Sequence, residues 1–214
     1  MKLLFIGNSH TYYNDMPAMV KGLLEGVGER SHVTMLTQGG KSLTYHCDEQ
    51  APRFNIRYGR YDAVIAQDRV SDFDPALFQT GAERLLKLTT EAGVPLTFYM
   101  PWAPRDRRER QRDMTDAYSA FCRRNRCALA PAGEVFMRLL QRDPCDLLYR
   151  EDGAHATVAG SYVAAVTIFY MLTGRRRVIA LKEETDPGLA AGLSPDLCGR
   201  IHAEACRVVR LYNG

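Results

Sequence analysis

Short apolar runs alternate with amphipathic segments along the chain. These runs predict five strands, at Leu3–Ile6, Val33–Thr37, Ala63–Ala66, Leu96–Met100 and Cys127–Ala130. Several of them are apolar at successive positions. This is typical of strands in a parallel sheet that helices cover on both faces. Because strands that alternate with helices need crossover connections, the pattern predicts an α/β fold.

The segments between the strands carry the caps and the spacing of helices. An aspartate or serine followed within two residues by proline marks three helix starts, at Asp15, Asp74 and Ser194. The apolar positions that keep helical spacing, and that we expect to face inward, are Val20, Leu23, Leu24, Val27, Leu77, Phe78, Gly81, Leu85, Leu88, Leu197, Ile201, Val208 and Leu211.

Five strand–helix units predict a three-layer α/β/α sandwich with a flavodoxin-like, parallel five-stranded sheet in the order 2-1-3-4-5. Crossovers in such sheets are right-handed, and ligand sites lie at the carboxyl ends of the strands, beside the point where the strand order reverses. No repeat or linker interrupts the pattern, so we expect residues 1–214 to form one domain.

Composition and charge narrow the class of protein. Apolar residues make up 46% of the chain and the net charge is +3. A charge this small argues against a nucleic-acid surface. The six cysteines, which form no Cys-x-x-Cys pair, are expected to be reduced and mostly buried, without a metal; they are Cys47, Cys122, Cys127, Cys145, Cys198 and Cys206.

The most apolar stretch of the chain is Val158–Leu172, which contains Gly160, Ser161 and Thr167. It is shorter than the roughly 20 apolar residues that a membrane span needs, so we predict a buried helix and no membrane partner. The first strand begins at about Lys2, which leaves no room for a secretory signal. We therefore expect a cytoplasmic protein.

The first candidate for chemistry is Ser9, in Gly7-Asn8-Ser9-His10 directly after the first strand. A tight turn at this point can hold a hydroxyl above the sheet edge with its own backbone N–H free, as an acyl-enzyme mechanism requires. The alternative is structural, because Ser9 or Asn8 could simply cap a turn.

The second candidate is the pair Asp152 and His155, three positions apart before the apolar helix. One tight turn lets the carboxylate meet the imidazole, fix its tautomer and stabilise the imidazolium that forms when a serine proton is taken. The alternative role of Asp152 is the N-cap of the helix through Thr157–Leu172. We expect that one carboxylate cannot easily serve both roles.

Two further loops are predicted at the same sheet edge. Gly40, in Gly39-Gly40-Lys41-Ser42 after the second strand, lets the backbone turn an N–H toward a ligand. Gln67 ends the third strand, and a side-chain amide there is a suitable oxyanion donor. The sequence thus predicts an oxyanion hole made by Ser9, Gly40 and Gln67.

These blocks resemble those of the SGNH/GDSL hydrolase superfamily. Gly7-Asn8-Ser9 resembles the serine block after strand 1, Gly40 resembles the glycine block, and Asp152-x-x-His155 resembles the C-terminal block. The resemblance implies a flavodoxin-like sandwich and ester hydrolysis or acyl transfer. Two positions depart from the family: Asn8 replaces the usual Asp, and Gln67 stands where Asn is expected. The strings around Ser9 and His155 resemble a bacterial subgroup with the same substitutions.

The remaining candidates are weaker. His10 and Trp102 lie on the functional edge, where they could line a substrate pocket or only pack. Tyr12 and Tyr13 are expected to pack. Cys47 lies between His46 and Asp48, but adjacent side chains point apart, so a thiol nucleophile is disfavoured. The arginine-rich segment 105–112 is expected to be a solvated loop and helix start.

The leading hypothesis is a serine esterase that cleaves a small carboxylic ester, with Ser9, His155 and Asp152 as catalytic residues and no cofactor. An acetyl ester of a carbohydrate is the substrate that the family resemblance suggests. The rival is a non-catalytic, flavodoxin-like module that binds phosphate or flavin through Ser9, Thr11 and Tyr12. That rival gives no role to Asp152 and His155. The sequence does not predict an oligomeric state.

Overall fold

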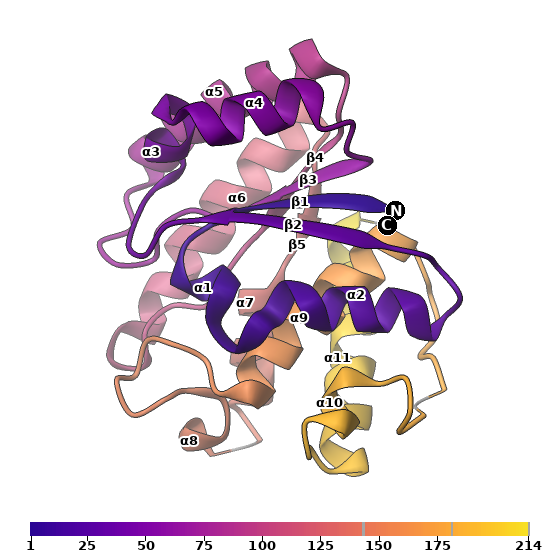
Figure 1. The fold of residues 1–214 in the computed structure, drawn as a ribbon. Helices are drawn as coiled ribbons and strands as arrows, with labels where there is room; N and C mark the ends of the chain where they lie inside the picture. The colour runs from indigo at the N-terminus through magenta and orange to yellow at the C-terminus, as the bar shows by residue number, and fades with distance from the viewer. Residues whose placement is uncertain (143, 181, 214) are drawn as a thin grey trace.

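A computed structural model describes residues 1–142, 144–180 and 182–213. Its centre is a parallel five-stranded sheet in the order β2-β1-β3-β4-β5, which confirms the predicted fold class (Figure 1). The strands are β1 (Lys2–Gly7), β2 (His32–Thr37), β3 (Ala63–Ala66), β4 (Leu96–Tyr99) and β5 (Ala128–Ala130). Each predicted strand is present, and its ends differ from the prediction by at most one residue.

Helices cover both faces of the sheet. In Figure 1, α3 to α6 lie above it, and α2, α7, α9 and α11 lie below. The helical segments are α1 (Ser9–Tyr12), η1 (Tyr13–Asp15), α2 (Met16–Gly26), α3 (Leu43–Asp48), α4 (Gln50–Tyr58), α5 (Pro75–Ala92), η2 (Arg105–Arg110), α6 (Gln111–Asn125), α7 (Ala132–Leu139), α8 (Cys145–Leu148), α9 (Val158–Thr173), α10 (Pro187–Ala190) and α11 (Pro195–Asn213).

The interior strand β1, between β2 and β3, contributes side chains to both halves of the core. Leu3 and Phe5 pack among α2, α9 and α11, whereas Leu4 and Ile6 pack among α3, α5 and α6. This division follows from the alternation of side chains along a strand, and it explains why the strand is apolar throughout. The β1 register, with Leu3 opposite Val33 of β2 and Ala63 of β3, brings the ends of these strands to one edge.

The helix α9 is buried from Ala159 to Tyr170, as its apolar sequence predicts. Among the described residues, no helix is long and apolar enough to cross a membrane. The segment 105–112 is largely exposed and forms η2 and the start of α6, as expected.

Two predicted core positions are wrong. Leu77 and Leu211 are 54% and 65% exposed, although both keep the spacing of their helices. Leu77 lies in the first turn of α5 and Leu211 in the last turn of α11. Periodicity gives the direction of a side chain, but it does not show whether another element lies opposite the end of a helix.

Described cysteine side chains are free thiols. Cys47, Cys122, Cys198 and Cys206 are buried, and Cys127 is half-buried. Burial raises the pKa of Cys47 to about 11 and that of Cys198 to about 11, so neither is a ready thiolate. The side chain of Cys145 lies outside the described part of the structure.

Candidate active site

The turn after β1 positions Ser9. A Cβ atom at Gly7 would clash with the Thr11 hydroxyl and would lie 2.7 Å from Gln67 Oε1, so only glycine fits there. Asn8 caps α1, because its Oδ1 accepts the His10 N–H at 3.1 Å. Ser9 therefore begins a helical turn at the carboxyl end of β1. The structural alternative was that Ser9 or Asn8 caps a turn, and in the structure Asn8 is the cap.

The hydroxyl of Ser9 meets His155 from the other end of the chain. Ser9 Oγ lies 2.8 Å from His155 Nε2, and His155 Nδ1 lies 2.7 Å from Asp152 Oδ2. An ionised carboxylate only accepts hydrogen bonds, so the proton of a neutral His155 is on Nδ1. Its Nε2 is then the acceptor for the Ser9 hydroxyl. The structure thus brings together the three predicted catalytic residues in one hydrogen-bonded series.

The Asp152 carboxylate divides its two oxygens between two tasks. Oδ1 accepts the backbone N–H groups of Ala154 and His155, both at 2.9 Å, whereas Oδ2 contacts the imidazole. Partial burial raises the pKa of Asp152, but these hydrogen bonds outweigh it and lower the pKa to about 2. The alternative role of Asp152, the N-cap of α9, is not the one that it has in the structure. The cap of α9 itself is Thr157.

Asn14 joins the Ser9 segment to the His155 segment. Its Nδ2 donates to the carbonyls of Ala156 and Thr157 at 3.1 and 3.0 Å, and to Ser161 Oγ at 2.8 Å. The backbone of Asn14 has a φ of 53°, a left-handed conformation that asparagine tolerates better than most residues. Sequence analysis missed this residue. The signal available was its position, five residues after the serine.

Tyr13 covers the His155 imidazole. Its ring stacks on His155 with a centroid distance of 4.4 Å, and the Arg150 guanidinium lies 5.3 Å from the Tyr13 ring centroid. Tyr13 was expected only to pack. Tyr13 does pack, and its ring packs on that of His155.

Gln67 does not face the site as predicted. Its Oε1 accepts the Asn8 N–H at 3.2 Å and the Thr11 hydroxyl at 3.0 Å, and its Nε2 donates to the Asp68 carbonyl. Two donors at Oε1 fix the orientation of the amide, because a flipped amide would place its NH₂ group against them. The side chain is fully buried. In this arrangement Gln67 braces the turn around Ser9 and is not an oxyanion donor.

Gly40 lies on the exposed turn after β2, with a φ of 69°. Asn8 Nδ2 donates to the carbonyl of the next residue, Lys41, at 3.0 Å and so ties this turn to the Ser9 turn. Within residues 1–142, 144–180 and 182–213, the Ser9 N–H has no backbone or side-chain acceptor. The geometry leaves this N–H available to a ligand.

His10 and Trp102 are both buried. Their exposed fractions are 7% and 1%, and their ring centroids lie 5.2 Å apart. Trp102 stacks on Phe136 at 4.6 Å, so packing, the alternative to a pocket role, describes it. Both residues belong to the support of the site.

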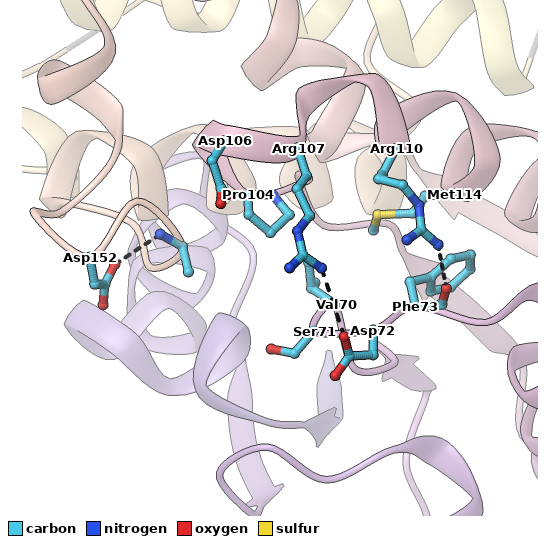
Figure 2. Close-up of a pocket in the computed structure, with 11 residues that line it drawn as sticks. Val70, Ser71, Asp72, Phe73, Pro104, Asp106, Arg107, Arg110, Met114 and Asp152 are labelled. Atoms are coloured by element: carbon cyan, nitrogen blue, oxygen red, sulfur yellow. Dashed lines mark hydrogen bonds and ion pairs between the residues drawn. The ribbon is translucent and has the colours of Figure 1, made fainter.

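A cavity of about 230 Å³ opens beside the Asp152–His155 turn (Figure 2). One wall is the loop after β3 and the other is η2; Arg107 Nη1 lies 3.8 Å from Asp72 Oδ1 between them. Val70, Phe73 and Met114 supply buried apolar lining, while the charged lining residues are Asp72, Asp106, Arg107, Arg110 and Asp152. Asp152 and Ala154 belong both to the cavity wall and to the Asp152–His155 turn.

Comparison by sequence gives no match to a protein family and none to a curated protein. Comparison with solved structures gives several matches. A protein of the DUF4886 family from Bacteroides uniformis has a TM-score of 0.77 at 17% identity, covering 98% of this chain and 95% of its own. A candidate SGNH hydrolase from Slackia heliotrinireducens has a TM-score of 0.66 at 22% identity, covering 80% and 98%.

An acetylxylan esterase from Geobacillus stearothermophilus, solved as a catalytic mutant, has a TM-score of 0.63 at 16% identity, covering 80% of this chain and 93% of its own. At these identities the likeness concerns the fold. The chain therefore has the α/β/α fold seen in solved SGNH hydrolases and acetylxylan esterases.

Proposed function

We propose that the protein is a serine esterase of the SGNH hydrolase type. The observation that carries this proposal is the unbroken series from Ser9 through His155 to Asp152, with contacts of 2.8 and 2.7 Å. A hydroxyl, an imidazole and a carboxylate in this relation form a nucleophile, a base and a group that orients the base. The likeness to solved SGNH hydrolases and esterases supports the same conclusion.

In the proposed reaction, Ser9 Oγ attacks the carbonyl carbon of an ester while His155 Nε2 takes the hydroxyl proton. The proton then passes from Nε2 to the departing alcohol, which leaves an acyl group on Ser9. A water molecule, deprotonated by His155, attacks the acyl carbon and releases the acid. Asp152 holds Nδ1 throughout and stabilises each imidazolium.

The negative oxygen of each tetrahedral intermediate needs hydrogen-bond donors. We assign the N–H groups of Ser9 and Gly40 to this role. The Ser9 N–H is unpaired within the described residues, and the Asn8–Lys41 hydrogen bond holds the Gly40 turn beside it. Losing one such donor typically costs about 10²–10³-fold in kcat.

The cavity next to Asp152 and Ala154 and the structural neighbours support a proposal for the substrate class. A space of about 230 Å³ with an apolar floor and charged walls suits a short, polar ester better than a long acyl chain. An acetyl ester of a carbohydrate has this character, and an acetylxylan esterase shares the fold.

Hydrolysis of p-nitrophenyl acetate tests the proposal. We expect turnover by the native protein and a loss of about 10³-fold or more in Ser9→Ala, because that substitution removes the nucleophile. Ser119→Ala, a change on α6, is the matched control and should keep full activity. Equal turnover by Ser9→Ala and the native protein would refute the assignment.

A further inference from the structure

The cavity beside the Asp152–His155 turn adjoins the side of the site where an alcohol would depart. In the proposed reaction His155 returns its proton to the alcohol oxygen, so the alcohol lies on the side of the ester that faces His155. The acyl oxygen lies on the other side, toward the N–H groups of Ser9 and Gly40. Asp152 and Ala154, from the turn that carries His155, line the cavity.

The floor of the cavity is apolar. Its three buried apolar residues are Val70, Phe73 and Met114. A sugar ring presents C–H groups on its faces and hydroxyl groups around its edge. The floor therefore suits the face of such a ring, and the polar residues around the floor suit its edge.

The charges around the cavity favour a neutral alcohol. Three carboxylates and two guanidiniums line it, and they belong to Asp72, Asp106, Asp152, Arg107 and Arg110. The excess of negative charge opposes an alcohol that carries a phosphate or carboxylate group. Carboxylates accept hydrogen bonds from hydroxyl groups, and guanidiniums donate hydrogen bonds to them. The lining thus indicates an uncharged alcohol with several hydroxyl groups.

Of the two arginines, Arg110 has a structural task. Its Nη2 donates to the Phe73 carbonyl at 2.8 Å, and its Nε donates to Asp113 Oδ2 at 3.1 Å. Figure 2 shows the first of these contacts, which joins η2 to the loop after β3. Arg110 therefore holds the two walls of the cavity together.

Arg107 is held much more loosely. It lies at an interruption of η2, where its φ of −134° and ψ of 39° are not helical, and its side chain reaches toward Asp72 on the opposite wall (Figure 2). The 3.8 Å between Arg107 Nη1 and Asp72 Oδ1 is too long for a hydrogen bond, and the side chains are 56% and 80% exposed. Such a pair contributes little to stability and leaves its donors and acceptors available to a ligand.

We propose that Arg107 and Asp72 are specificity-determining residues that bind the free hydroxyl groups of a neutral sugar, the alcohol part of the ester. The Arg107 guanidinium donates to one hydroxyl oxygen, and the Asp72 carboxylate accepts from a neighbouring hydroxyl group. The apolar floor contacts the face of the ring. This inference rests on the proposed function, because it assigns the alcohol that the esterase releases.

Two acetyl esters separate recognition of hydroxyl groups from ester chemistry. Monoacetylated methyl xyloside and cyclohexyl acetate both release a secondary alcohol on a six-membered ring, but only the xyloside carries free hydroxyl groups. We expect kcat/KM of the native protein to be about 10- to 100-fold higher for the xyloside, as hydrogen bonds to charged groups would give. Equal values for the two esters would overturn the proposal.

Arg107→Met keeps the length of the side chain and removes its donors. We expect kcat/KM for the xyloside to fall about tenfold or more, and to fall much less for cyclohexyl acetate, with Tm close to native. The control is Arg112→Met, because Arg112 is 88% exposed and does not line the cavity, and it should keep the native preference. An equal fall for both esters in Arg107→Met would contradict recognition of hydroxyl groups.

Binding of methyl xyloside, which has no ester, tests the site without turnover. In Ser9→Ala we expect this sugar to shift the backbone amide NMR signals of residues 70–73 and 105–110, and to shift them much less when Arg107→Met is added. These shifts in a protein that cleaves no ester would keep the sugar site and reject the proposed function. Absent shifts, or equal shifts in both proteins, would overturn the sugar site even if Ser9 proves to be the nucleophile.

Discussion

At the scale of single residues, the tautomer of His155 is set by Asp152. The carboxylate accepts from Nδ1 through Oδ2, which leaves Nε2 as an acceptor for Ser9. The same carboxylate holds the turn through Oδ1. Orientation of the base and local backbone geometry therefore depend on one side chain.

The substitution Asp152→Asn separates these two tasks. Its oxygen can still accept the N–H groups of Ala154 and His155, but its NH₂ group faces Nδ1 and favours the tautomer with the proton on Nε2. That tautomer cannot accept the Ser9 proton. We expect kcat to fall about 10⁴-fold with KM nearly unchanged. Steady-state kinetics with p-nitrophenyl acetate measure both, and an Asn variant with a tenth of native kcat would contradict the assignment.

The lowered pKa of Asp152 also predicts a dependence of stability on pH. A carboxyl with a pKa of about 2 in the folded protein, below its unfolded value of about 3.9, stabilises the fold above pH 4. This contribution is lost as pH falls through about 2. The difference in Tm between the native protein and Asp152→Asn should shrink as pH falls below about 4. A difference that grows on acidification would be inconsistent with this pKa.

At the scale of elements, the active site depends on how η1 is fastened to the start of α9. Asn14 makes three hydrogen bonds across this junction, and Ser161 Oγ returns one to the Tyr13 carbonyl at 3.2 Å. The Tyr13 ring then rests on His155. These contacts link segments that are more than 140 positions apart in the chain.

Asn14→Gly tests this junction without adding backbone strain, because glycine accepts the left-handed conformation. We expect a loss of about 1–3 kcal/mol in unfolding free energy, since polar groups at the junction lose their partner, and a lower kcat. The control is Asp15→Gly, because Asp15 has a similar φ of 52° and makes no capping hydrogen bond. Urea unfolding should show little loss of unfolding free energy in Asp15→Gly. Equal losses in the two variants would contradict a stabilising role for the Asn14 side chain.

At the scale of the whole molecule, a buried polar network fastens the C-terminal part of the chain. The Tyr162 hydroxyl contacts Asp186 Oδ2 at 2.6 Å and His202 Nε2 at 2.8 Å, and Tyr170 contacts the other nitrogen of His202 at 3.0 Å. The network joins α9, α10 and α11. None of its members belongs to the catalytic series.

Tyr162→Phe should therefore lower stability far more than catalysis. The change leaves Asp186 and His202 buried without the shared hydroxyl, which costs about 1–3 kcal/mol. We expect a lower Tm and a kcat that changes much less than in Asn14→Gly. A large loss of kcat with an unchanged Tm would contradict this expectation and would show that the network affects catalysis.

Across these scales, the features that depend on local sequence patterns were predicted better than the features that depend on contacts between distant residues. The strands and their order follow from apolar patterning and from the geometry of parallel sheets. The meeting of Ser9 with His155 was expected from the chemistry of the two blocks and from the family resemblance. The predicted role of Gln67 was wrong, because a side chain at the correct edge can turn inward when its oxygen accepts hydrogen bonds from buried donors. Asn14 was missed because its three acceptors lie on a segment far away in the chain, which no local pattern reveals.

The most direct measurement is covalent labelling of the native protein with a fluorophosphonate, followed by mapping of the adduct by mass spectrometry. We predict a single phosphonylated residue, Ser9, with labelling lost in Ser9→Ala and strongly slowed in His155→Ala. Labelling at another residue, or undiminished labelling in His155→Ala, would contradict the claim that these two residues act together.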